Sequence, residues 1–245
     1  RYALIAIGSI ATGLLDPLAN WATVASLSPR QDHFPTDWPW FDLAPLAEPV
    51  AYLLGAYTTY YLITGALFYW LVDRLMLRRA SPASWIGRHP LLTLFIAVYV
   101  LSFPLNMWLQ VEWMKAGVLL YTQFPGPILD FGGHKLPLLI QFYDPFVYAA
   151  VALLCVPDEQ GESRVLVQVA SKLPFGSVAS SGRQAVAAAV VLVATFMVPI
   201  GSFCLMRLSG IDYPVIYQSN PWPETKVYDP FDYLERAGKQ VAGGR

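Results

Sequence analysis

The stretch YALIAIGSIATGLLDPLANWATV, residues 2–24, decides the fold class. It is apolar over the length of about 20 residues that crosses a lipid bilayer as a helix. Asp16-Pro17 interrupts it, and this pair sets an ionisable group beside a break in helical hydrogen bonding. A bilayer tolerates such a pair where protein or water covers the exposed backbone, so we expect Asp16 to line a cavity.

Two further acid-proline pairs, Glu48-Pro49 and Asp144-Pro145, begin or interrupt other apolar stretches. We interpret the three acids as the lining of one cavity, which is the candidate catalytic site. The alternative is that each pair starts a helix, with the acid capping free amides and proline in the first turn. That alternative suits Glu48 poorly, because glutamate is a weak N-cap residue.

The composition indicates a membrane protein and limits its partners. Apolar residues make up 56% of the chain and charged residues 13%, and the mean hydropathy is +0.44, whereas soluble domains hold about 25% charged residues. A net charge of -1 without a basic run predicts no nucleic-acid partner. The isolated cysteines and histidines predict no metal site, and the sequence lacks the glycine-rich GxGxxG and GxxxxGK[ST] nucleotide motifs.

We predict an all-α fold, a polytopic transmembrane helix bundle with at least one proline-broken helix. Residues 1–206 would form the bundle, with an aromatic outer loop at 25–48, and residues 207–245 an extramembrane tail. Prolines and glycines at 125–133 predict a loop. Because the chain shown begins with Arg1, we take the span count as a lower bound. About five spans are expected, at 2–24, 49–72, 91–110, 136–156 and 185–205.

The charges of the loops predict an orientation in the cell membrane. Seven basic residues lie in the loops of one side and three in those of the other, which favours Arg1 on the cytoplasmic side. In this orientation Asp16, Glu48, Glu112 and Asp144 all lie toward the outer surface.

Several other residues are candidates for substrate binding, and each has a simpler interpretation. Asn106 and Gln110 are four apart, so they share a helix face and either line the pocket or hydrogen-bond between helices. Trp38 and Trp40 either wall an apolar pocket or belong to an interfacial aromatic belt. Glu112 either contacts substrate or pairs with Lys115 at the surface.

A cluster of buried acids supports acid-base chemistry. One carboxyl group that keeps its proton beside another that stays ionised can expel a hydroxyl as water and deprotonate an attacking alcohol. Proton transport, or simply holding helices together, remains open from this pattern.

Three strings carry a family resemblance: LLDPLANW at 14–21, HFPTDWPWFDLAPLAEP at 33–49 and PGPILDFGGHKLPLLIQFYDPF at 125–146. With them the chain resembles the avermectin-type spirocyclase (AveC-like) family of actinobacterial multi-pass membrane proteins. The resemblance implies cyclisation of a dihydroxy-ketone polyketide to a spiroketal, in some members with dehydration, without metal or cofactor. It gives Asn20 and Trp21 a supporting role in substrate binding. The assignment of Asp144 as the acid, and of Asp16 or Glu48 as the base, rests only on the expected placement of the carboxylates.

The expected partners are membrane lipid and an apolar small-molecule substrate. The main alternative function is a non-enzymatic membrane subunit or lipid-handling partner of an envelope complex, which would dock a protein through the outer loop or the tail. A terpene-cyclase-like membrane enzyme would use the same acids on another substrate.

Overall fold

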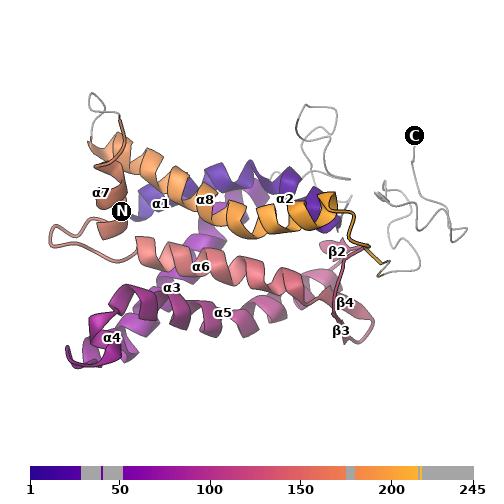
Figure 1. Ribbon diagram of the computed structural model, residues 1–245, viewed down its shortest axis with the longest axis horizontal. Helices are drawn as coiled ribbons and strands as arrows, with labels where there is room; N and C mark the ends of the chain where they lie inside the picture. The colour runs from indigo at the N-terminus through magenta and orange to yellow at the C-terminus, as the bar shows by residue number, and fades with distance from the viewer. Residues whose placement is uncertain (29–39, 41–51, 175–179, 215, 217–245) are drawn as a thin grey trace, which may run out of the picture. The chain divides into compact units, whose positions relative to one another are not determined.

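The computed structural model describes residues 1–28, 40, 52–174, 180–214 and 216, and these residues are mostly helical (Figure 1). The prediction of a helical chain is therefore confirmed. The helices are α1 Tyr2–Gly13, α2 Asp16–Thr23, η2 Tyr52–Tyr60, α3 Tyr61–Leu75, η3 Leu77–Arg79, α4 Trp85–Arg88, α5 Pro90–Lys115, η4 Leu139–Phe142, α6 Tyr143–Leu154, α7 Arg164–Ala170 and α8 Ser180–Leu208. Of these, η2 is a π-helix, and η3 and η4 are 3-10 helices. The strands are β1 Ala25–Leu27, β2 Leu119–Tyr121, β3 Ile128–Phe131 and β4 His134–Pro137.

Two helices in the described part of the chain, α5 and α8, are each long and apolar enough to cross a membrane. They match the predicted spans 91–110 and 185–205. Helices α1 and α2 qualify as a third span only if they are taken together, and Leu139–Leu154 is a shorter apolar helix. The arrangement of five spans therefore stays a prediction.

The predicted loop at 125–133 is wrong in part, because β3 and β4 pair as an antiparallel hairpin. Gly132 and Gly133 form its two-residue turn with φ of 67° and 92°, a conformation that glycine adopts without steric cost. The predicted start of the fourth span at Leu136 is also wrong. Leu136 belongs to β4, and α6 begins only at Tyr143.

The chain divides into two compact units, which are described separately. The first unit comprises Arg1–Leu14, Leu53–Asn106 and Tyr143–Met197. The second comprises Leu15–Tyr52, Met107–Phe142 and Val198–Arg245. Helices α5 and α8 each run from one unit into the other.

Small residues allow close helix packing in the first unit. Helices α3 and α6 pack together (Figure 1), and a Cβ atom on Gly65 would lie 2.5 Å from Cγ1 of Val151. A Cβ atom on Gly8 would lie 2.8 Å from the backbone carbonyl carbon of Ala188. Larger side chains at Gly8 or Gly65 would therefore push the helices apart.

A small sheet organises the second unit. Strand β1 pairs antiparallel with β2, so that Ala25 lies opposite Tyr121. The chain beyond α8 returns to the same region, where the Ile216 N–H donates to the Thr122 carbonyl at 2.8 Å and the Phe124 N–H donates to the Pro214 carbonyl at 3.2 Å. The described residues that follow α8 are thus held by backbone hydrogen bonds.

Candidate functional site

Asp144 is the buried carboxylate of the first unit. It is the second residue of α6 and is 4% exposed, and the following Pro145 is tolerated because the first helical turn has no partner for its missing N–H. The hydroxyl of Tyr61, the first residue of α3, donates to Oδ1 of Asp144 at 2.8 Å. Asp144 therefore lies in the first turn of one helix and accepts a hydrogen bond from a residue of another. It does more than cap its own helix.

A second polar pair lies one turn further along α6. Tyr148 follows Asp144 by four residues, and its hydroxyl donates to Oδ1 of Asn106 on α5 at 3.4 Å. Both residues are completely buried. Asn106 thus makes the interhelical hydrogen bond that the sequence offered as its simpler role. Its predicted contact with substrate stays a prediction.

Aromatic rings surround these two pairs. The ring centroids of Tyr61 and Tyr148 lie 5.6 Å apart, those of Tyr57 and Tyr61 5.4 Å, and those of Tyr60 and Tyr148 5.3 Å. Tyr57 and Tyr60 come from the π-helix that leads into α3, and π-helical turns occur frequently at functional sites. The result is a buried carboxylate in a largely apolar, tyrosine-rich environment.

Asp16 is a buried carboxylate of the second unit. It is the first residue of α2 and is 3% exposed. Its Oδ2 accepts a hydrogen bond from Nδ2 of Asn20 at 2.5 Å. The two residues are four apart on one helix, so this contact forms within α2 alone. The structure thus brings together two of the residues that the sequence singled out.

Arg207 and Trp21 form a partly buried contact in the second unit. The guanidinium carbon of Arg207 lies 4.0 Å from the ring centroid of Trp21, and its NH1 group donates to the Trp21 carbonyl. Nearby, the Tyr213 hydroxyl donates to the carbonyls of Ala22 at 3.3 Å and Phe203 at 3.4 Å. Burial raises the pKa of Tyr213 to about 12, so its hydroxyl keeps its proton at neutral pH.

The remaining predicted residues differ in their surroundings. Gln110 is buried and accepts from the Tyr121 hydroxyl at 3.2 Å. Glu112 forms an ion pair with Lys115 at 2.8 Å, the surface role that the sequence offered as the simpler one. Trp40 is 42% exposed. Glu48 and Trp38 lie outside the described residues.

The predicted meeting of the acids in one cavity stays a prediction, since Asp16 belongs to the second unit and Asp144 to the first. Among the residues that the structure describes, no three His, Cys, Asp or Glu side chains are grouped so that they could hold a metal ion.

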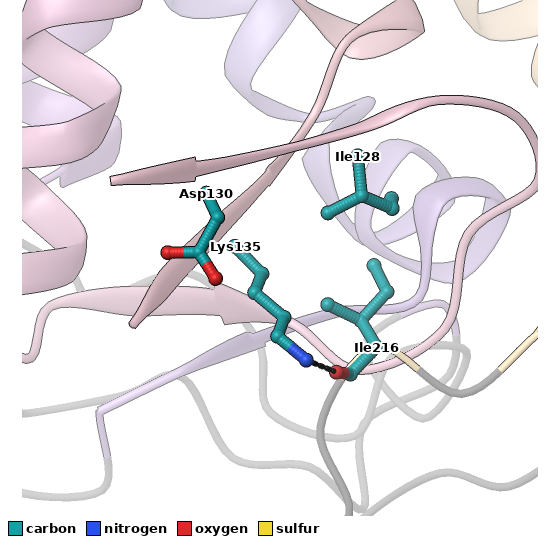
Figure 2. A pocket seen from close by; sticks show the side chains of 4 residues that line it. All are labelled: Ile128, Asp130, Lys135 and Ile216. Carbon is teal, nitrogen blue, oxygen red and sulfur yellow. Dashed lines mark hydrogen bonds between the residues drawn. The ribbon is translucent and has the colours of Figure 1, made fainter. Parts of the chain in front are cut away.

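A hollow of about 240 Å³ in the second unit is lined by Ile128, Asp130, Lys135 and Ile216, whose side chains are drawn in Figure 2. The Lys135 ammonium group donates to the Ile216 carbonyl at 3.2 Å, and Asp130 Oδ1 accepts from the Gly133 N–H at 2.7 Å. Asp130 therefore supports the hairpin turn, whereas Lys135 bonds the segment that follows α8.

Sequence reasoning missed Tyr61, Tyr148 and Arg207. Tyr148 had a usable signal, because its spacing of four residues from Asp144 places both on one face of a helix. Tyr61 is one of several tyrosines in its segment, and nothing in the spacing distinguishes it. Arg207 was counted with the tail, although α8 continues to Leu208.

Comparison with known proteins gives one family. The family model described as Spirocyclase AveC-like matches residues 2–228. No curated protein and no solved structure matches the chain.

Proposed function

We propose that this chain, which belongs to the Spirocyclase AveC-like family, is a membrane-embedded cyclase in which Asp144 transfers the protons. The substrate class is an apolar hydroxy ketone of polyketide or lipid-like origin. The family supports the cyclase role, and the two long apolar helices α5 and α8 support the membrane setting. The observation that carries the proposal is the buried Asp144 carboxylate held by the Tyr61 hydroxyl at 2.8 Å.

The reaction begins when one substrate hydroxyl adds to the ketone and gives a hemiketal. The Asp144 carboxylic acid then donates its proton to the hemiketal hydroxyl, the C–O bond breaks, and water leaves. The resulting oxocarbenium ion faces the newly formed Asp144 carboxylate, whose negative charge stabilises it. Loss of water is thus coupled to the appearance of an anion where positive charge develops.

The second substrate hydroxyl then attacks the oxocarbenium carbon and loses its proton. If the Asp144 carboxylate accepts that proton, the acid is restored, and the net reaction converts a dihydroxy ketone into a spiroketal and water. Asp16 and Glu48 are the alternative proton acceptors predicted from the sequence. The Tyr61 hydroxyl donates to the carboxylate form of Asp144 and holds it in position between the two transfers.

The test compares Asp144→Asn with Asp130→Asn in membranes that contain the protein and a dihydroxy-ketone substrate. The asparagine in Asp144→Asn would keep nearly the same shape but carry no acidic proton, so we expect turnover to fall by about 100- to 10,000-fold. Asp130 is an exposed hairpin residue, and its substitution should leave turnover unchanged. Product formation is followed by chromatography, and thermal unfolding of each variant is measured in parallel.

Two outcomes contradict the proposal. Retention of most of the turnover by Asp144→Asn would remove Asp144 from the chemistry. A loss of folding that accounts for the lost turnover would make Asp144 a structural residue. Asp144→Glu separates these cases, because a restored carboxyl group should recover part of the turnover only if a proton carrier is needed.

A further inference from the structure

A compact turn joins α3 to α5 in the first unit. It closes on itself because the N–H and the hydroxyl of Ser84 both donate to the Ser81 carbonyl, at 2.9 and 2.6 Å. The Gly87 N–H donates to the Ser84 hydroxyl oxygen at 3.1 Å, and a Cβ atom on Gly87 would overlap the Ser81 carbonyl oxygen. The closed turn therefore brings Arg79, just before it, toward Arg88, just after it.

Arginines dominate the charge of this connection. Residues 73–89 contain four arginines and one acid, Asp73. Asp73 forms an ion pair with Arg78 at 2.6 Å. Arg79 and Arg88 are both exposed, and neither forms an ion pair with an acid in the part of the chain that the structure describes. The pair Arg79 and Arg88 therefore has its positive charge available for an anion from outside the chain.

Exposed apolar stripes on two helices lead to this connection. The exposed residues recur every four positions, at Leu92, Ile96 and Val100 on α5 and at Ile63 and Leu67 on α3. Residues at this spacing share one face of a helix. Because α5 is long and apolar enough to cross a membrane, lipid hydrocarbon is the environment that suits these stripes.

Two tryptophans lie where the stripes give way to the arginines. Trp70 near the end of α3 is 52% exposed and Trp85 in α4 is 49% exposed. The guanidinium carbon of Arg74 lies 5.6 Å from the ring centroid of Trp70. Tryptophan is enriched at the level of the lipid headgroups. The order of stripe, tryptophan and arginine therefore matches the change from hydrocarbon to phosphate in a lipid leaflet.

The connection between α6 and α7 has the opposite charge. Helices α3 and α6 begin together at the hydrogen bond between Tyr61 and Asp144, and they pack closely again where Gly65 meets Val151. The segments that follow the two helices therefore lie at the same end of the unit. Residues 155–163 contain three acids and no basic residue. An anion at this end is thus attracted by one connection and repelled by the other.

We infer that Arg79 and Arg88 bind the phosphate of an anionic phospholipid at the membrane surface. This inference rests on the membrane setting of the proposed function but not on its chemistry. Each guanidinium group can donate two parallel hydrogen bonds to phosphate oxygens, while the lipid chains cover the apolar stripes of α3 and α5. A zwitterionic headgroup carries its own cation beside the phosphate, so it binds less tightly.

The experiment measures the binding of two short-chain lipids to the purified full chain in detergent micelles by native mass spectrometry. Dioctanoyl phosphatidylglycerol is anionic, and dioctanoyl phosphatidylcholine has the same chains without net charge. Because each basic residue near the surface contributes about fivefold in affinity for anionic lipid, we expect phosphatidylglycerol to bind about 25-fold more tightly. This ratio of dissociation constants should fall to about fivefold in Arg79→Gln and in Arg88→Gln, and to about one in the double variant.

Arg164→Gln is the matched control, because Arg164 is also exposed in the first unit but follows the acidic connection. It removes the same charge and should keep the ratio of the unaltered protein. Since Arg79, Arg88 and Arg164 are all exposed, their substitution should leave the protein folded.

Three results would overturn the inference. One is a ratio that does not change in Arg79→Gln and Arg88→Gln. Another is an equal fall in Arg164→Gln, because net charge and not the turn would then set the affinity. The third is equally strong competition by soluble glycerol 3-phosphate, which would make the ligand a free phosphate instead of a lipid. The two lipids undergo no reaction, so these results are independent of the turnover that tests the proposed function.

Discussion

Asp16 and Asp144 lie in the first turns of helices in two different units, and the donors of their hydrogen bonds distinguish them. Each is followed by proline, lies in the first turn of a helix and is almost fully buried. Asp16 accepts from Asn20 in its own helix, whereas Asp144 accepts from Tyr61 on another helix. The same dipeptide thus gives a carboxylate with a donor from its own helix in one unit and a carboxylate with a donor from another helix in the other.

The difference has a physical origin in the residues around each pair. Asn20 lies four residues after Asp16, so α2 supplies its own donor wherever the helix lies. Asp144 depends on the close approach of α3 to α6, which Gly65 permits. The Asp144 pair is therefore sensitive to how closely the two helices pack.

The largest expected effect distinguishes the two acids directly. Asp16→Asn should lower turnover less than about tenfold and lower the free energy of unfolding by about 1–3 kcal/mol, because a buried charged hydrogen bond is replaced by a neutral one. Asp144→Asn should lose about 100- to 10,000-fold in turnover. Both variants are assayed for turnover and thermal unfolding in the same membrane preparation.

Equal losses of turnover in the two variants would break the comparison. Asp16 would then be the proton acceptor that the sequence predicted. Asn20→Leu provides the matching check, since it removes the donor to Asp16 and keeps the carboxylate. If Asp16 only supports α2, the loss of stability in Asn20→Leu should resemble that in Asp16→Asn.

The sequence located the buried acids but not their partners. A proline after an acid inside an apolar stretch is a local signal, and both described acids proved to be buried helix starts. The partner of Asp144 is 83 residues away, and no periodicity connects Tyr61 with that position. The partner of Asp16 belonged to a matched motif, yet the motif alone did not indicate a hydrogen bond within one helix.

The short strands were not predicted from the sequence, for a different reason. Gly132-Gly133 between two short segments is a hairpin signal, and the prolines nearby led to the prediction of a loop instead. The pairing of residues 214 and 216 with Thr122 and Phe124 joins segments far apart in the sequence. Such pairing depends on the tertiary fold, and local propensity contains no information about it.

A smaller effect tests how the second unit is held together. Arg207→Lys keeps the charge but loses the planar guanidinium group that stacks on Trp21. We expect the free energy of unfolding to fall by about 1 kcal/mol, with turnover nearly unchanged. Arg74→Lys is the matched control, because Arg74 lies over Trp70 at 5.6 Å and is exposed. Loss of turnover in Arg207→Lys without loss of stability would give the second unit a direct part in the reaction.

The smallest expected effect concerns Glu112, which the sequence associated with the site. The side chain of Glu112 is 42% exposed, and that of its ion-pair partner Lys115 is 47% exposed. Exposed ion pairs contribute about 0–1 kcal/mol to the free energy of unfolding. Glu112→Gln should therefore change neither turnover nor stability measurably. Lys115→Gln removes the same ion pair but keeps the carboxylate. If turnover falls in Glu112→Gln and not in Lys115→Gln, the Glu112 carboxylate itself is needed for the reaction. Glu112 would then be a functional residue and not only a member of a surface ion pair.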